Sequence, residues 1–131
     1  MIALKVIISF LDHRTQSVKL NSEESTLKPV LTGVPQGSIL APTLFLLFIN
    51  DLLKLPTISR SFAYADDTVF VTSDVDVKAL ESNCNNDLQL IDNWCKSNKM
   101  PINMEKSHFL HHNSRANNSL ALKIDNCGLK Q

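Results

Sequence analysis

The spacing of hydrophobic positions changes along this chain, and each change predicts a different element. Over residues 77–95 apolar side chains recur at intervals of three and four, which is typical of an amphipathic helix with one apolar stripe. We expect this helix over residues 76–98, with Asp74 or Asp76 as its N-cap and Pro101 just beyond its end.

Shorter apolar runs separated by polar residues predict β-structure. Residues 61–64 and 68–71 are two such runs around a polar turn, and they predict a hairpin within residues 61–72. Further strands are expected within residues 102–126, at 102–110 and 119–124, on either side of a polar turn at 113–118.

A glycine-containing loop over residues 33–38 precedes a strongly apolar segment. Ser38 can cap a helix there, and Pro42 falls where a missing N–H matters little. Because this helix, expected over 39–55, is apolar almost all round, we predict that it is buried against a sheet. Its unbroken apolar run, residues 44–49, is too short to span a membrane.

Two adjacent carboxylates, Asp66 and Asp67, fall at the expected tip of the hairpin. Paired carboxylates bind hard cations such as Mg²⁺, which in nucleotide chemistry bridge protein and phosphate oxygens. Turns also favour aspartate for a structural reason, since its side chain bonds to the local backbone. The pair alone therefore predicts either a metal site or an ordinary turn.

Composition limits the class of protein more than its function. The chain has 131 residues, 44% hydrophobic content and zero formal net charge, so one domain is expected. The helices and strands predicted above make its class α+β. A neutral balance is weak evidence against strong nucleic-acid binding, although the segment from residue 96 onward is basic. Cys84, Cys95 and Cys127 lack zinc spacing, and we expect reduced thiols and an intracellular location.

Four segments together resemble the reverse transcriptase domain of a non-LTR (LINE-type) retrotransposon. They are Gly-Val-Pro-Gln-Gly-Ser at residues 33–38 with the helix after it, Tyr-Ala-Asp-Asp at 64–67, the segment 94–106 with its Asn-x-x-Lys ending, and the Leu-x-x-Arg-x-Gln-x-Val pattern within 7–21. The resemblance implies a partial polymerase palm, an antiparallel sheet with packed helices that lacks the fingers and the first palm strand.

The family resemblance also implies roles for individual residues. Asp66 and Asp67 would bind Mg²⁺ in a two-metal site, and Lys106 would hold or protonate the leaving pyrophosphate, unless it is only a surface lysine. The residues implied on the template and nucleotide side are Pro35, Gln36, Gly37 and Tyr64. The implied partners are an RNA template, a DNA primer and deoxynucleoside triphosphates, and no membrane.

One essential motif of the family is absent from these segments. Phe10-Leu11-Asp12 superficially reads like the first palm strand, but it lies too close to Gly33 and belongs to the Arg14-containing pattern. Because a two-metal site needs the third carboxylate of that strand, we expect that this chain alone does not polymerise DNA. A noncatalytic retroelement remnant that acts in binding or assembly is therefore the alternative.

Two further chemistries remain open at this point. A nucleotidyl cyclase on a similar palm sheet would use the aspartates but leaves residues 33–38 unexplained. His108, His111 and His112 would either bind a transition metal or form an ordinary strand end, and no fourth ligand is obvious.

Overall fold

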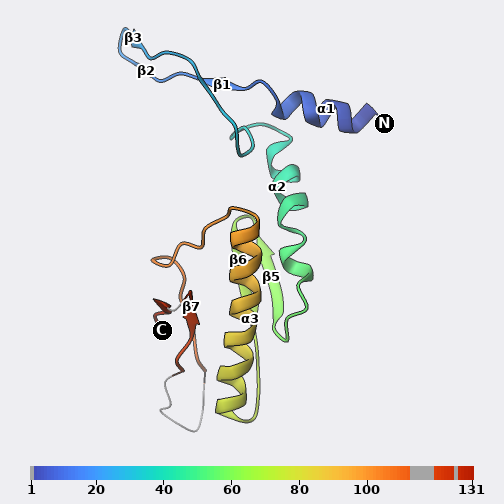
Figure 1. Cartoon of the computed structure of the whole chain (residues 1–131), viewed down its shortest axis with the longest axis vertical. Helices are drawn as coiled ribbons and strands as arrows, with labels where there is room; N and C mark the ends of the chain where they lie inside the picture. Colours follow the sequence, from blue (N-terminus) through green and yellow to red (C-terminus); the bar gives the residue numbers. More distant parts are fainter. Residues whose placement is uncertain (1, 113–119, 126) are drawn as a thin grey trace. The chain divides into compact units, whose positions relative to one another are not determined.

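The computed structural model describes residues 2–112, 120–125 and 127–131. The chain forms two compact units, Met1–Phe48 and Ile49–Gln131, and each has its own helices and antiparallel strand pairs (Figure 1). The predicted α+β class is confirmed, with the strands of the described residues paired two by two. The single domain predicted over residues 1–131 stays a prediction.

The first unit begins with a helix, a long hairpin and the glycine-containing loop, and it includes most of the helix that follows the loop. In the hairpin Thr15 pairs with Pro29 and Lys19 pairs with Glu24, so one strand carries an extra residue between its two ladders. Asn21 turns the chain at the tip with a φ of 56°, a conformation that asparagine tolerates. The elements are α1 (Ile2–Leu11), β1 (Thr15–Gln16), β2 (Lys19–Leu20), β3 (Glu23–Glu24) and β4 (Lys28–Pro29).

The apolar helix after the loop is shorter and more exposed than predicted. α2 (Ala41–Ile49) ends before the polar pair Asn50-Asp51, and a 3₁₀ turn, η1 (Leu52–Lys54), follows. Leu46 and Leu47 are 53% and 63% exposed, so the prediction of a helix over 39–55 that is buried against a sheet is wrong for this face. An apolar helix face needs a covering surface from elsewhere, and the described residues leave this face open.

Within the part of the chain that the structure describes, no helix has the length and apolar character that a bilayer span requires.

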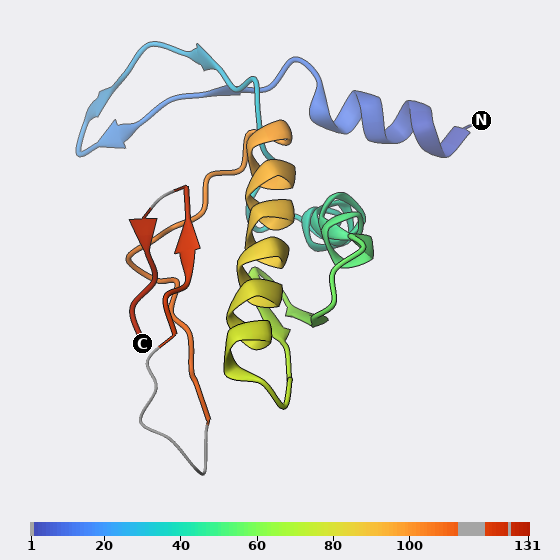
Figure 2. The ribbon, with the colours of Figure 1, turned by 60° about the horizontal axis from the view of Figure 1, so that its bottom comes forward.

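The second unit is organised around one long helix. α3 (Val77–Ser97) lies between two hairpins in both views (Figures 1 and 2). One hairpin is formed by β5 (Arg60–Tyr64) and β6 (Asp67–Val71), and the other by β7 (Lys123–Ile124) and β8 (Cys127–Gly128). The buried apolar residues of the second unit are Ile49, Leu52, Ile91, Cys95, Leu120, Leu122 and Ile124.

The start and the apolar stripe of α3 confirm the helix predicted over residues 76–98. The side chain of Asp76 accepts a hydrogen bond from the backbone N–H of Ala79 at 3.1 Å, and such a cap satisfies a helix donor that has no internal partner. Ile91 and Cys95 are buried on the stripe. The helix ends at Ser97, and Lys99 then adopts a φ of 55°.

Side chains of α3 bind the backbone of the segment that leads into β7. Asn85 donates from Nδ2 to the carbonyl of Ala121 at 3.1 Å, and its Oδ1 accepts from the N–H of Lys123 at 3.0 Å. Glu81 accepts from the N–H of Ala121 at 3.0 Å. The helix therefore serves this segment as a neighbouring strand would.

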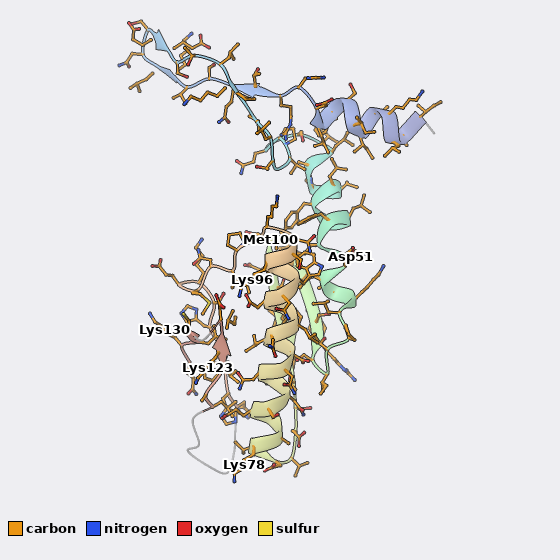
Figure 3. All side chains as sticks on the ribbon, viewed as in Figure 1. Asp51, Lys78, Lys96, Met100, Lys123 and Lys130 are labelled. Atoms are coloured by element: carbon orange, nitrogen blue, oxygen red, sulfur yellow. The ribbon has the colours of Figure 1, made fainter. Side chains whose placement is uncertain are left out.

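A lysine near the end of α3 completes the connection to the second hairpin. Lys96, labelled in Figure 3, forms ion pairs with Asp92 and Asp125, each at 2.8 Å. Hydrogen bonding to Asp125 first, and to Asp92 next, raises the pKa of the Lys96 ammonium. Because the lysine is exposed, these pairs contribute little to stability.

The distal part of the unit departs from the prediction. Residues 102–110 do not form the predicted strand, because the side chain of Asn103 closes a turn over residues 104–106. His108 makes an isolated bridge with Lys130. Of the strand predicted over 119–124, β7 covers the last two residues, and the turn predicted at 113–118 lies outside the described residues.

Candidate active site

The predicted hairpin is present and has a two-residue turn. Tyr64 pairs with Asp67, which leaves Ala65 and Asp66 as the turn. Ala65 has a φ of 52°, a left-handed conformation in which its Cβ crowds the backbone and which costs roughly 1–2 kcal/mol. The chain thus keeps a strained alanine between its tyrosine and its paired aspartates.

The tip of the hairpin presents two carboxylates to solvent. Asp66 lies in the turn, Asp67 is the first residue of β6, and both are exposed. Among the described residues no side chain forms a hydrogen bond or ion pair with either carboxylate. Tyr64, immediately before the turn, is 85% exposed. The hairpin therefore brings these three predicted site residues together with their polar groups available.

The glycine-containing loop of the first unit owes its shape to two left-handed residues. Gly33 and Gly37 have φ values of 75° and 79°, which favour glycine. No atom lies within 4 Å of a Cβ built on either glycine, so conformation rather than crowding within this chain explains them. Between them, Pro35 is partly buried and Gln36 is exposed.

The far end of this loop is connected to the start of α2 by a serine. The hydroxyl of Ser38 donates to the carbonyl of Pro35 at 2.8 Å and accepts from the N–H of Ala41 at 3.2 Å. Ser38 therefore satisfies the first N–H of α2, but it is not the predicted N-cap, because α2 begins at Ala41 and its first internal bond runs from Leu44 to the carbonyl of Leu40. Gln36 and Gly37 form the turn that this serine closes, so its two bonds hold them in place.

An arginine holds the near end of the loop. Arg14 donates from Nη2 to the carbonyl oxygens of Gly33 at 2.6 Å and Thr32 at 3.3 Å. Its Nε donates to the carbonyl of Leu11, the last residue of α1, at 3.0 Å. The Leu-x-x-Arg spacing noted in the sequence thus has a structural reason, because one guanidinium joins the helix end to the loop.

A turn centred on Asn103 sets the position of Lys106. The side-chain oxygen of Asn103 accepts from the N–H groups of Glu105 and Lys106, at 3.1 and 3.3 Å. Its carbonyl accepts from the N–H of Lys106 at 3.2 Å and from the hydroxyl of Ser107 at 2.8 Å. The Asn-x-x-Lys spacing therefore corresponds to a side-chain-closed turn that leaves Lys106 exposed.

The structure brings only some of the predicted site residues together. Tyr64, Asp66 and Asp67 share one hairpin, and Lys106 lies in the same unit. Among the described residues no hydrogen bond or ion pair links Lys106 to either aspartate. Pro35, Gln36 and Gly37 belong to the first unit, and their meeting with the aspartates stays a prediction.

A residue that the sequence analysis missed holds the other end of the hairpin. Asp87 is buried, with 3% exposure, and accepts from the N–H groups of Ile58 at 3.0 Å and Ser59 at 2.8 Å. The hydroxyl of Ser59 also donates to Asp87 and contacts the hydroxyl of Thr72. The sequence did carry one signal for this residue. Asp87 follows Cys84 by three positions, so this charged side chain falls at the helical spacing of the apolar stripe.

The remaining candidate ligands do not form a metal centre. Within residues 2–112, 120–125 and 127–131, no three histidine, cysteine or acidic side chains are placed to hold an ion together. The transition-metal reading of His108, His111 and His112 is therefore not supported.

The cysteines behave as core residues or as free thiols. All three are unpaired by disulfides. Burial raises the pKa of the Cys84 thiol, with a further increase from the charge of Asp87 that a hydrogen bond with Thr72 opposes. Burial, followed by the charge of Asp92, raises the pKa of Cys95.

Comparison with known proteins places these features in a family. A family model described as "Reverse transcriptase (RNA-dependent DNA polymerase)" matches residues 2–124. The chain is 33% identical over 108 residues to the RNA-directed DNA polymerase from mobile element jockey of Drosophila melanogaster, and the match covers 77% of this chain. It is 29% identical over 117 residues, 78% of its length, to the probable RNA-directed DNA polymerase from transposon BS of the same organism.

The matched segment is a small part of each relative. Each spans only 12% of the relative's length. No solved structure matches the chain.

Proposed function

Because this chain belongs to the reverse transcriptase family, as the match over residues 2–124 shows, we propose that it forms part of the palm of an RNA-directed DNA polymerase. The predicted relationship to retrotransposon enzymes is confirmed by the two mobile-element relatives. The observation that carries the proposed activity is the hairpin tip, where Asp66 and Asp67 are exposed next to each other.

The chemistry of this tip fits a Mg²⁺ ion that both carboxylates would bind. Carboxylate oxygens are the protein ligands that Mg²⁺ prefers, and the ion commonly uses one or two of them together with substrate phosphates. Asp66 and Asp67 supply two carboxylates with no competing partner among the described residues. When bound, Mg²⁺ offsets charge on the reacting phosphate and on the leaving pyrophosphate.

The proposed reaction is nucleotidyl transfer from a deoxynucleoside triphosphate. The 3′-hydroxyl of a DNA primer loses its proton to solvent, its oxygen attacks the α-phosphorus, the bond to the bridging oxygen breaks, and pyrophosphate leaves. Gln36 and Gly37, with Pro35 and Tyr64, would contact the RNA template or the nucleotide. Lys106 would hold the pyrophosphate or give it a proton. We also propose an intracellular location, which the three free cysteines support.

A chimeric polymerase tests this proposal, because the chain spans 12% of its relatives. In the chimera, this chain replaces the aligned segment of the jockey polymerase, and extension of a DNA primer on an RNA template is measured. We expect extension, and we expect Asp66→Ala and Asp67→Ala each to abolish it. Lys78→Ala, a change at an exposed lysine in the first turn of α3 (Figure 3), is the control that should retain it.

Two outcomes would contradict the proposal. Full extension by either aspartate variant would remove that residue from the chemistry. A chimera that binds primer and template but extends nothing, in a host enzyme that is active with its own segment, would favour the noncatalytic alternative.

A further inference from the structure

We propose that Asp87 is a positioning residue that fixes the Asp66–Asp67 hairpin on α3. This inference rests on the proposed function, because positioning matters only if the two aspartates act together with groups outside the hairpin. Asp87 itself touches neither aspartate. It acts through the residues at the base of the hairpin.

Asp87 binds at the base of the hairpin. Ser59 immediately precedes β5, and Thr72 immediately follows β6. Since Arg60 pairs with Val71, these two residues form the next position of the same register, and their hydroxyl groups are in contact. Asp87 therefore holds both strands at the end of the hairpin that is opposite to Asp66 and Asp67.

Both carboxylate oxygens of Asp87 accept hydrogen bonds. Oδ1 of Asp87 accepts from the N–H of Ile58, and Oδ2 accepts from the N–H and the hydroxyl of Ser59. Because the single proton of Ser59 is committed to Asp87, the hydroxyl of Thr72 is the donor in the contact between the two hydroxyls. Three donors thus converge on a group that has acceptors alone, and hydrogen bonds to such an ionised acceptor are the stronger kind.

The contact between Asp87 and Ser59 is buried. Asp87 and Ser59 are 3% and 8% exposed, and a buried polar group without its partners is strongly disfavoured. Water therefore cannot easily replace these bonds, and the contact has one low-energy arrangement. Asparagine would not preserve it, because its NH₂ group would face one of the donors in either orientation.

The length of the hairpin amplifies at its tip any tilt at its base. From Ser59 to Tyr64 the strand advances five residues, roughly 17 Å at about 3.3 Å per residue. A tilt of about 10° at the base would therefore move the tip by about 3 Å, and displacements of about 1 Å in a catalytic group can reduce rates roughly a hundredfold. A fixed base is thus the condition for a fixed pair of metal ligands.

Paramagnetic relaxation in the full 131-residue chain tests the inference with Mn²⁺ as the probe. Mn²⁺ at the tip broadens the amide signals of residues 65–68, which reports the proposed metal site. It also relaxes the indole proton of Trp94 on α3, which reports the distance between tip and helix. The two readouts separate binding at the tip from positioning of the tip.

The variants are chosen so that one of them stays folded. Asp87→Asn replaces the acceptor group, while Ser59→Ala and Thr72→Val each remove a single hydroxyl contact. Asp51→Asn is the matched control, because Asp51 is exposed and its side chain makes no capping hydrogen bond.

We expect Mn²⁺ affinity at the tip to stay within about twofold in all variants, because Asp66 and Asp67 are unchanged. The relaxation of Trp94 should fall by at least half in Asp87→Asn, fall less in the hydroxyl variants, and stay unchanged in Asp51→Asn. A merely destabilising change would reduce the folded fraction without altering the relaxation within folded molecules. If Asp87→Asn does not fold, the smaller fall expected in folded Ser59→Ala supports the inference.

Amide exchange keeps the inference testable if the metal site fails. Absence of Mn²⁺ broadening at the tip in the unaltered chain would overturn the proposed metal site, not the role of Asp87. In that case, exchange at the Ile58 and Ser59 amides should still become at least tenfold faster in Asp87→Asn, while the β5–β6 ladder stays protected. Unchanged Trp94 relaxation in folded variants, or unchanged exchange, would overturn the inference.

Discussion

Nη2 of Arg14 lies 2.6 Å from the carbonyl oxygen of Gly33, and this bond ties the loop to the end of α1. The same guanidinium reaches the carbonyl oxygens of Thr32 and Leu11. A planar group with several fixed donors can serve three acceptors, whereas a lysine ammonium cannot reproduce that geometry.

We therefore expect Arg14→Lys to lower the free energy of unfolding of the first unit by about 1 kcal/mol, the typical net contribution of one hydrogen bond. Amide exchange over residues 33–38 should become faster. Arg60→Lys, at an exposed arginine, is the control that should change neither quantity. Equal stability and exchange in Arg14→Lys would show that the charge alone holds the loop.

The left-handed φ of Ala65 gives a prediction about stability. Ala65→Gly should raise the free energy of unfolding by about 0.5–1 kcal/mol, because relief of the Cβ strain exceeds the added freedom of the unfolded chain. Ala63→Gly, within β5, should lower it by about 0.5–1 kcal/mol, since strand glycines are unfavourable. Urea unfolding followed at the hairpin amides measures both, and the same sign for both would refute the strain.

The Asn103 turn gives a prediction about catalysis in the chimeric polymerase. Lys106→Ala should slow primer extension roughly a hundredfold without abolishing it, a typical contribution of a positioned acid. Asn103→Ala should slow it less, because the turn loses its closing oxygen while the lysine remains. Asn103→Asp keeps that oxygen and should restore most of the rate. An unchanged rate in Lys106→Ala would return this lysine to an ordinary surface role.

The raised pKa values of two cysteines predict a loss of stability at alkaline pH. Burial raises the pKa of Cys84 and Cys95 in the folded chain, so the folded state keeps its thiol protons more tightly than the unfolded state does. The free energy of unfolding should therefore be level below about pH 8.5, the ordinary cysteine pKa, and should fall as the pH rises through the raised values.

A cysteine double variant measures this effect. Cys84→Ala combined with Cys95→Ala should flatten the decline between about pH 8.5 and 10, a window below most lysine titration. Cys127→Ala, at the exposed cysteine, should decline as the unaltered chain does. An equal slope in the double variant would assign the decline to other groups.

Local sequence signals predicted the elements that depend on neighbouring residues. The period of α3 and its Asp76 cap, and the polar turn of the β5–β6 hairpin, are interactions within a few positions. Residues 102–110 were misjudged because Asn103 closes a turn there, which outweighs a weak alternation. The burial of α2 was misjudged because burial depends on surfaces far away in the chain.

The same distinction applies to the candidate site. Asp66 and Asp67 are recognisable from the motif and its turn, but the role of Asp87 depends on contacts across 28 and 29 positions. No local pattern specifies which loop a helix carboxylate will meet. A charge on an apolar stripe nevertheless indicates that a polar partner must exist.

The contacts of Glu81 and Asn85 with residues 121–123 tie the length of α3 to the alignment of a strand. Four helical residues advance about 6 Å, and two strand residues advance about 6.6 Å, so the two side chains meet successive backbone sites. One inserted residue between them would rotate Asn85 by about 100° away from its partners. In the evolution of this fold, single-residue insertions and deletions should therefore be selected against in this turn of the helix, although substitutions on its exposed side are tolerated.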